Sequence, residues 1–299
     1  MHHLRFFILL FFVLLSGRLS AQIDIKRYTT ATDTFYWKRY IHVPEPKKLN
    51  LKQFTTHGTK KEITDFLAGN LSQFSQFTND SISRLGVNDL KKCLFPVDIN
   101  GDNLTDMIFS GFSGGESDVV QIFLNQGTRF DLVFEDYQFI TKLNLANGKL
   151  TELQTGDRGC CDAYLYFTRD YTVSQDSTGP VFIKGKQTVI YQYTEEPGEF
   201  FATPKQFSAH ADTLMVRASA ARLNEPYNPH LDTFGNIVAK YRTRARGIAL
   251  GKKSYGKGND WYFVEIYPDA TPSASILYET TKIPTFLRGW VSGKGIDFN

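Results

Sequence analysis

Two hydrophobic periodicities divide the first two thirds of the chain. Between residues 61 and 78, large apolar side chains recur at helical spacing: Ile63, Phe66, Leu67, Leu71, Phe74 and Phe77. This spacing predicts one amphipathic helix packed on a sheet. Short apolar runs with alternating polar positions then follow at 107–112, 118–125, 130–139, 150–153, 163–173 and 181–193. Such alternation predicts strands.

Turn-forming residues separate these runs. The clusters Asn125-Gln126-Gly127 and Asn147-Gly148 suit tight hairpins, so we expect an antiparallel sheet. The polar stretch Thr194–Ala209 reads as a linker, and a second strand-rich block starts at Leu214. The predicted fold class is therefore mostly β. An α+β domain with one amphipathic helix occupies 22–205, and a smaller β domain occupies 206–299.

The first residues have the layout of a secretory signal peptide. His2, His3 and Arg5 precede the apolar run Phe6–Leu15, and small residues lead to Ala21. The apolar run is shorter than the roughly 20 residues of a membrane helix. We expect a signal peptide over 1–21, cleavage after Ala21, a secreted or periplasmic protein, and no integral membrane span after cleavage.

Composition narrows the classes of partner. The formal net charge is only +3, which argues against nucleic acid as a partner, and the 25 Phe and 15 Tyr residues favour β structure. The three cysteines are Cys93, Cys160 and Cys161. An odd number in an oxidising compartment allows one structural bridge, from Cys93 to Cys160 or Cys161, and leaves one thiol over.

An acidic loop lies directly before the strand at residue 107. Oxygen-bearing side chains occupy alternate positions, as Ca²⁺ requires of a short loop that wraps around it. The predicted ligands are Asp98, Asn100, Asp102 and Asp106, with the main-chain carbonyl of Leu104. The alternative is an Asx-rich turn without an ion.

The spacing of this loop resembles the calcium loops of FG-GAP and VCBS-type repeats, D-x-[DN]-G-D-x-x-x-D. Asn103 stands where those repeats usually have Gly, and one copy is present where a propeller needs several. The resemblance covers about 20 residues. It implies a metal loop with a structural Ca²⁺ ion, and it does not extend to a propeller fold.

Five ordered segments near the C-terminus resemble bacterial SH3-like (SH3b) domains. They are Leu214–Ser219, Gly235–Lys240, Ile248–Leu250, Asp260–Ile266 and Arg288–Val291, the last two matching the D-W-Y-x-V and G-W-V strands. Ala220 replaces the usual proline, and inserts occur at 224–232 and 268–287. The resemblance implies a small SH3-like β-barrel that binds cell-wall peptide or glycan, or an envelope protein.

Aromatic residues of this module are candidates for a ligand groove. They are Tyr227, Tyr255, Trp261 and Trp290, and the alternative for each tryptophan is packing in the core. Cations at 240, 242, 244 and 246 would share one face of a strand. They form either an anion-binding patch or a solvated edge strand protected by positive charge.

Patterns typical of enzymes are weak. Ser113 lies in a G-x-S-x-G sequence, but the residues after it are typical of a strand, and a nucleophile elbow needs a helix. The G-x-x-x-x-G-K spacing at 251–257 lacks the following Ser or Thr. We therefore expect a non-enzymatic binding protein of the cell envelope; the competing class is a cell-envelope hydrolase with an unrecognised site in the first domain.

Overall fold

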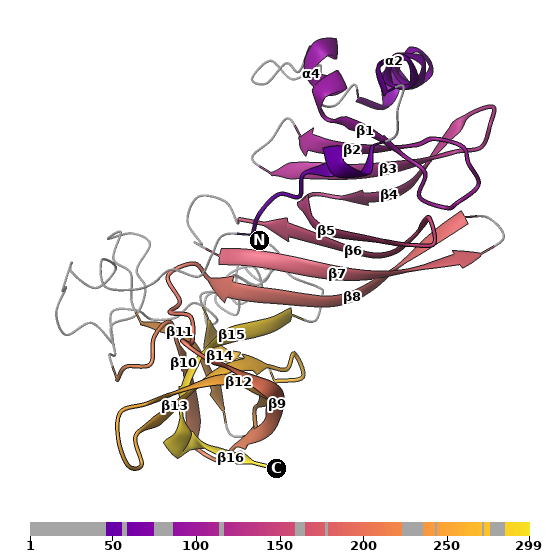
Figure 1. The fold of residues 1–299 in the computed structure, drawn as a ribbon. Coiled ribbons are helices and arrows are strands. Elements are labelled where there is room, and N and C mark those ends of the chain that lie inside the picture. Colours follow the sequence, from indigo (N-terminus) through magenta and orange to yellow (C-terminus); the bar gives the residue numbers. More distant parts are fainter. Residues whose placement is uncertain are drawn as a thin grey trace, which may run out of the picture. The chain divides into compact units, whose positions relative to one another are not determined.

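The computed structural model describes residues 46–55, 59–74, 86–113, 117–158, 165–176, 179–222, 236–242, 244–270, 272–275 and 285–299. They form a mostly β protein with antiparallel strands, as the sequence predicted (Figure 1). The chain divides into two compact units, Glu45–Val189 and Ile190–Asn299. The predicted signal peptide lies outside the described residues. Within the described ranges, no helix combines the length and apolar character that a membrane crossing needs.

The first sheet of the N-terminal unit has four strands in the order β1-β2-β3-β4. Their bounds are β1 Leu94–Val97, β2 Asp106–Phe112, β3 Asp118–Asn125 and β4 Phe130–Asp136. All neighbours are antiparallel. The β3–β4 connection uses the predicted turn, because Gly127 adopts a φ of 81°. This left-handed conformation is open to glycine without strain.

Four longer strands follow in the order β8-β7-β6-β5. They are β5 Phe139–Ala146, β6 Lys149–Asp157, β7 Leu165–Asp176 and β8 Gly179–Tyr191. The turn at Asn147 and Gly148 has φ values of 52° and 75°, the positive pair that a two-residue type I′ hairpin demands. The single strand predicted over 130–139 is wrong. A bend at Tyr137 and Gln138 ends β4 and starts β5, which continues seven residues beyond the predicted end to Ala146.

Three helices cover one face of the first sheet: α2 Thr59–Asn70, η5 Leu71–Phe74 and α4 Val87–Lys92. The 3₁₀ turn η4 Leu51–Phe54 belongs to the other face, where Leu51 lies in the core with Ile108 and Leu150. The predicted amphipathic helix is confirmed, although it begins at Thr59 and tightens into a 3₁₀ turn at Leu71. Its residues Phe66 and Leu67 are buried with Phe74 of η5. Figure 1 shows α2 and α4 on the side of the first sheet opposite to β5–β8.

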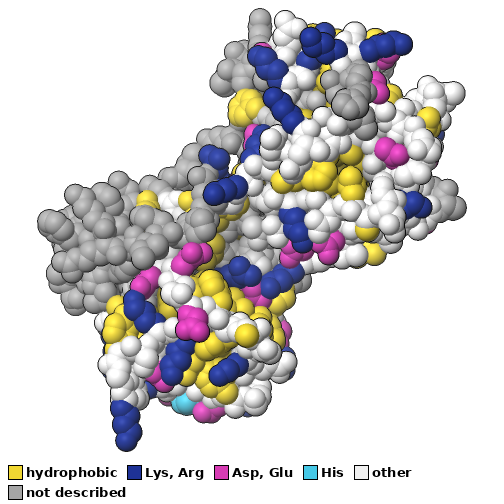
Figure 2. Space-filling model, in the orientation of Figure 1, with side chains coloured by type: hydrophobic (Ala, Val, Ile, Leu, Met, Phe, Trp, Pro, Cys, Tyr) yellow, Lys and Arg dark blue, Asp and Glu magenta, His cyan; other side chains and the backbone are white. Residues whose placement is uncertain are grey.

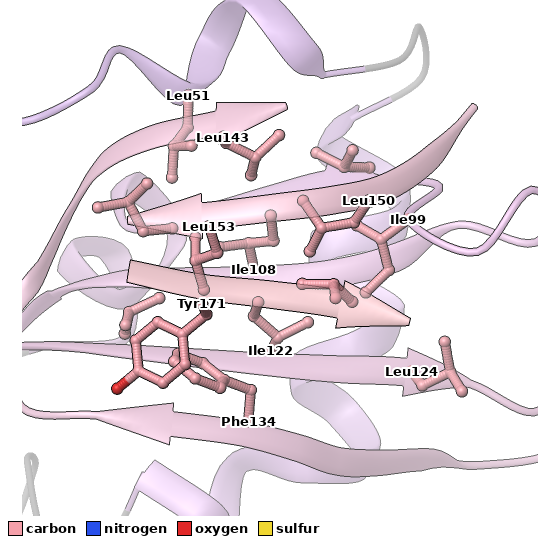
Figure 3. Close-up of a cluster of buried hydrophobic side chains, with 14 residues drawn as sticks. Leu51, Ile99, Ile108, Ile122, Leu124, Phe134, Leu143, Leu150, Leu153 and Tyr171 are labelled. Carbon is pink, nitrogen blue, oxygen red and sulfur yellow. The ribbon is translucent and has the colours of Figure 1, made fainter. Parts of the chain in front are cut away.

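Two hydrophobic cores result, one on each face of the first sheet. Met107 and Phe109 of β2 pack with the helices, whereas Ile108 between them packs with the second set of strands. Alternate side chains of a strand point to opposite faces, so a strand covered on both faces is apolar throughout. Figure 3 shows the core between the two sets of strands, where Ile108 and Ile122 lie opposite Leu150 and Leu153.

The C-terminal unit is an antiparallel array of eight strands in the order β16-β9-β12-β13-β15-β10-β11-β14. Their bounds are β9 Phe200–Ala209, β10 Thr213–Arg217, β11 Ile237–Arg242, β12 Arg246–Ser254, β13 Asp260–Ile266, β14 Pro272–Ser275, β15 Thr285–Ser292 and β16 Ile296–Phe298. Two corrections follow from this array. Residues 200–209, predicted as linker, form a strand between β12 and β16. The cations at 240–246 share no strand face, because Lys240 is buried, β11 ends at Arg242 and Arg244 has a φ of 81°.

Candidate functional site

The acidic loop is closed by its own side chains. Asp98 Oδ1 accepts hydrogen bonds from the amides of Asn100 and Gly101 at 3.3 and 2.7 Å, and its Oδ2 accepts one from Asn103 at 3.0 Å. Asp102 Oδ1 accepts one from the amide of Leu104 at 2.7 Å. Positive φ angles at Gly101 and Asn103, 75° and 66°, allow the loop to turn. These contacts are those of the Asx-rich turn.

Asp106 anchors the loop to the sheet. This carboxylate is fully buried and accepts the amide hydrogens of Ile99 at 2.9 Å and Asn125 at 2.8 Å. Burial raises the pKa of Asp106 to about 7; the nearby charges of Asp102 and Asp98 also raise it, whereas the two amide hydrogen bonds oppose the change. A buried acid with this pKa is the group that a cation would stabilise most in its charged form.

The oxygen donors of the loop fit a hard cation by type. Ca²⁺ prefers carboxylate, amide and main-chain carbonyl oxygens. Asp98, Asp102 and Asp106 could hold it, with Asn100 and the carbonyl of Leu104. In the described part of the chain, however, no three His, Cys, Asp or Glu side chains are grouped as a metal site. An ion must therefore use the remaining lone pairs of these oxygens or replace some of their amide hydrogen bonds.

The predicted groove residues that the structure describes do not form a surface groove. Trp261 and Trp290 are 2% and 0% exposed and lie in a core cluster with Phe263 and Ala220. The indole N–H of Trp290 donates to the main-chain carbonyl of Glu195 at 2.6 Å. Their burial excludes them from a surface groove, so the alternative of core packing holds for both.

Tyr255 lies apart from this core cluster. Tyr255 is 53% exposed in the β12–β13 connection, with the ammonium of Lys253 5.4 Å from its ring centroid. Tyr227 lies outside the described residues. Sequence reasoning therefore found one exposed aromatic residue of the C-terminal unit and missed the cluster described next.

A different set of aromatic residues forms a surface cluster on this unit, here called the aromatic patch. It consists of Phe201 of β9, Tyr262 of β13 and Phe298 of β16, with Lys205 of β9 and Lys252 of β12. The ring of Tyr262 lies between the other two, with centroid distances of 6.5 Å to Phe201 and 4.8 Å to Phe298. The ammonium groups of Lys205 and Lys252 lie 4.8 Å from the Phe201 centroid and 5.8 Å from the Tyr262 centroid.

Strand geometry explains why Tyr262 reaches the patch. Its neighbours Trp261 and Phe263 point into the core, so Tyr262 points to the opposite side of β13, directly opposite Lys252 of β12. Tyr262 and Phe201 are partly exposed, and Phe298 is 40% exposed. Figure 2 shows hydrophobic and basic side chains interspersed on one face of this unit. The alternation around Tyr262 was a usable signal in the sequence, but Phe201 and Lys205 lay in the supposed linker.

The N-terminal unit also contains a buried polar network. Asp136 accepts hydrogen bonds from Arg169 at 2.5 Å, from the Tyr171 hydroxyl at 2.9 Å and from Thr155 at 2.8 Å. Arg169 also donates to Gln187 at 2.7 Å. Burial, followed by the charge of Asp136, raises the pKa of Tyr171 well above its usual value. Each of these side chains forms a hydrogen bond with another member of the network, which is typical of a structural role.

The enzyme-like patterns and the cysteines have structural explanations. Ser113 follows β2 and donates to the carbonyl of Ser117 at 2.6 Å, and the next described element is strand β3. The 251–257 stretch runs from β12 into a turn, and β13 follows it. Cys93 is a half-buried free thiol whose pKa is raised by burial, so the bridge expected from it is not formed. Cys160 and Cys161 lie outside the described residues.

Comparison with known proteins identifies no relative. No family model matches the chain, and no curated protein or solved structure matches it.

Proposed function

We propose that the protein is exported to the cell envelope and acts there as a non-enzymatic binding protein, with the C-terminal unit as its binding module. The cell-wall peptide or glycan is its proposed ligand, or an envelope protein its partner. The signal-like residues 1–21 support export.

One observation carries the proposal for the binding module. The five segments that resemble SH3b strands coincide with β10, β11, β12, β13 and β15. These strands pair β11 with β10, β10 with β15, β15 with β13 and β13 with β12, all antiparallel. The path continues from β11 to β14 and from β12 to β9, so the five segments lie in the middle of one larger antiparallel array. The pairing supports one cooperative module built from the resembling segments.

Co-sedimentation tests this function. Purified protein of residues 22–299 is mixed with purified peptidoglycan sacculi and centrifuged, and the soluble and pelleted fractions are compared. We expect saturable pelleting without release of soluble wall fragments. Absence of pelleting would rule out wall binding and direct the search to envelope proteins. Release of wall fragments would favour the competing class, a cell-envelope hydrolase.

We also propose that the acidic loop binds one structural Ca²⁺ ion. The supporting observation is Asp106, a buried carboxylate whose described neighbours in the loop are the acids Asp98 and Asp102. A divalent cation would offset their mutual repulsion and hold the loop that precedes β2.

Calorimetric titration with CaCl₂ tests the proposed ion. Asp98→Ala and Asp102→Ala should each abolish saturable binding, and chelator should lower the melting temperature of the unsubstituted protein. Asp89→Ala is the matched control, because Asp89 lies on α4 and pairs with Lys92 at 2.8 Å. If the unsubstituted protein binds no calcium, the loop is an Asx turn only.

A further inference from the structure

The aromatic patch is an exposed cluster of rings and is distinct from the core of the C-terminal unit. Three rings from three different strands meet at the surface of the C-terminal unit, and none of them is fully buried. Two strands that contribute to it, β9 and β16, lie outside the five segments that resemble an SH3b domain. The patch is therefore a property of this chain beyond that resemblance.

The electrostatics of the patch favour an anionic ligand. Lys252 is paired with Asp260 at 2.9 Å, and Asp260 also accepts a hydrogen bond from Ser254 at 2.6 Å. Lys205 contacts the ring of Phe201, and among the described residues no carboxylate forms an ion pair with it. Its positive charge is thus available to a ligand that covers the rings.

The exposed aromatic surface of the patch favours a sugar ligand. The Tyr262 ring meets the Phe298 ring at 71° and the Phe201 ring at 46°, so the patch offers a mixture of ring faces and edges. The C–H face of a pyranose packs on an aromatic ring, which removes apolar surface of both from water. A carboxylate on the sugar can accept a hydrogen bond from the lysine ammonium.

We propose that the aromatic patch binds an anionic polysaccharide, with a sugar ring against the exposed aromatic surface of Phe201, Tyr262 and Phe298 and an acidic substituent at Lys205. This assignment rests on the proposed binding function of the C-terminal unit and names its ligand class.

Binding of oligogalacturonate to the full protein of residues 22–299 tests the assignment. We expect saturable binding that weakens as the NaCl concentration rises. Phe201→Ala should raise the Kd about tenfold or more, and Lys205→Gln about threefold to tenfold, because an aromatic anchor contributes more than an exposed charge. A neutral cello-oligosaccharide of equal length should bind more weakly than oligogalacturonate.

Matched variants separate the patch from general effects. Phe200→Ala removes the neighbouring ring, which is 54% exposed and contacts Phe263 rather than Tyr262. Lys257→Gln removes an exposed cation from the β12–β13 turn. Both controls should retain the original Kd. Equal losses in Phe200→Ala and Phe201→Ala, or no loss in either patch variant, would refute the site.

Two further probes define the ligand class. Inorganic polyphosphate carries charge without sugar rings, and binding as tight as that of oligogalacturonate would refute the role of the rings. Pelleting with sacculi distinguishes the two proposals. If Phe201→Ala pellets as well as the unsubstituted protein, the wall-binding function stands and the patch is not its site. If the unsubstituted protein does not pellet, the wall-binding function is refuted, and binding of oligogalacturonate still tests the patch.

Discussion

The Asp136 carboxylate shows what burying a charge requires of its neighbours. Its side chain is 7% exposed and its partner Arg169 is 21% exposed. Their attraction offsets the loss of hydration, and the hydroxyls of Thr155 and Tyr171 occupy the second carboxylate oxygen. The network joins β4 to β6 and β7, so it links strands from both sheets of the N-terminal unit.

Removing one member of this network should be costly. Asp136→Ala leaves the Arg169 guanidinium without its counter-charge, and we expect the free energy of unfolding to fall by about 3 kcal/mol or more. Glu152→Ala is the control: both partners of its ion pair with Lys142 are exposed, so losing this pair should change the free energy of unfolding far less. Urea unfolding measures both. Similar losses in the two variants would contradict the structural role of the network.

Asp106 should make the stability of the metal-free protein depend on pH. Its pKa in the folded state, about 7, lies above the usual aspartate value of 3.8, so folding favours the protonated acid. The stabilisation is complete below about pH 4 and is lost as the pH rises through 7. In chelator, unfolding free energy should fall across this window by up to about 4 kcal/mol more than in Asp106→Asn. Equal pH profiles of the two proteins would show that Asp106 ionises normally.

Side-chain types were easier to predict than side-chain surroundings. The oxygen-bearing positions from Asp98 to Asp106 were identifiable because a short loop forces alternate residues inward. Alternation places Trp261 and Tyr262 on opposite faces of β13, but both side chains are aromatic, so the sequence did not indicate which of the two faces is buried. The tryptophan expected at the surface is buried, and its neighbour is partly exposed.

At the scale of elements, close packing of strands limits what a position accepts. A Cβ atom added at Gly247 of β12 would lie 2.1 Å from the main-chain carbonyl oxygen of Glu265 on β13. No rotamer change relieves this contact, because the Cβ position is set by the backbone. By contrast, a Cβ atom at Gly69 of α2 meets nothing within 4 Å.

The same substitution should therefore have opposite effects in the two elements. Gly247→Ala should lower the free energy of unfolding by roughly 2 kcal/mol or more, because β12 and β13 must separate. Gly69→Ala should raise it by about 0.5 to 1 kcal/mol, because alanine favours the helix. Thermal unfolding of the two variants checks both signs. Stabilisation by Gly247→Ala would contradict the β12–β13 register.

Elements with strong local signals were predicted, and elements defined by distant partners were not. The Asn147-Gly148 turn and the helix from Thr59 depend on neighbouring residues. Strand β9 contains Pro204 and has no regular alternation of apolar and polar residues, and it is held between β12 and β16, which follow far later in the chain. Its pairing could not be inferred from residues 200–209 alone.

At the scale of the whole molecule, export decides where the binding module can act. If residues 1–21 are a signal peptide, expression of the full chain in a bacterium should yield an exported protein that begins at Gln22. Leu10→Arg interrupts the apolar run and should retain the precursor in the cytoplasm. Lys26→Gln, beyond the cleavage point, should not. Intact-mass spectrometry of cell fractions distinguishes these outcomes, and an unprocessed exported chain would contradict cleavage after Ala21.

Strand β3 is covered on both faces, and this should slow the hydrogen exchange of its main-chain amides. β3 lies between β2 and β4, so its amides bond on both edges, and the helices and the second set of strands exclude water from both faces. Such amides exchange with solvent only when the whole cooperative unit opens. After transfer into heavy water, the protons of Val119 to Leu124 should be the last retained in the N-terminal unit, and their decay, compared with the exchange rate of an unstructured amide, gives the free energy of its global opening.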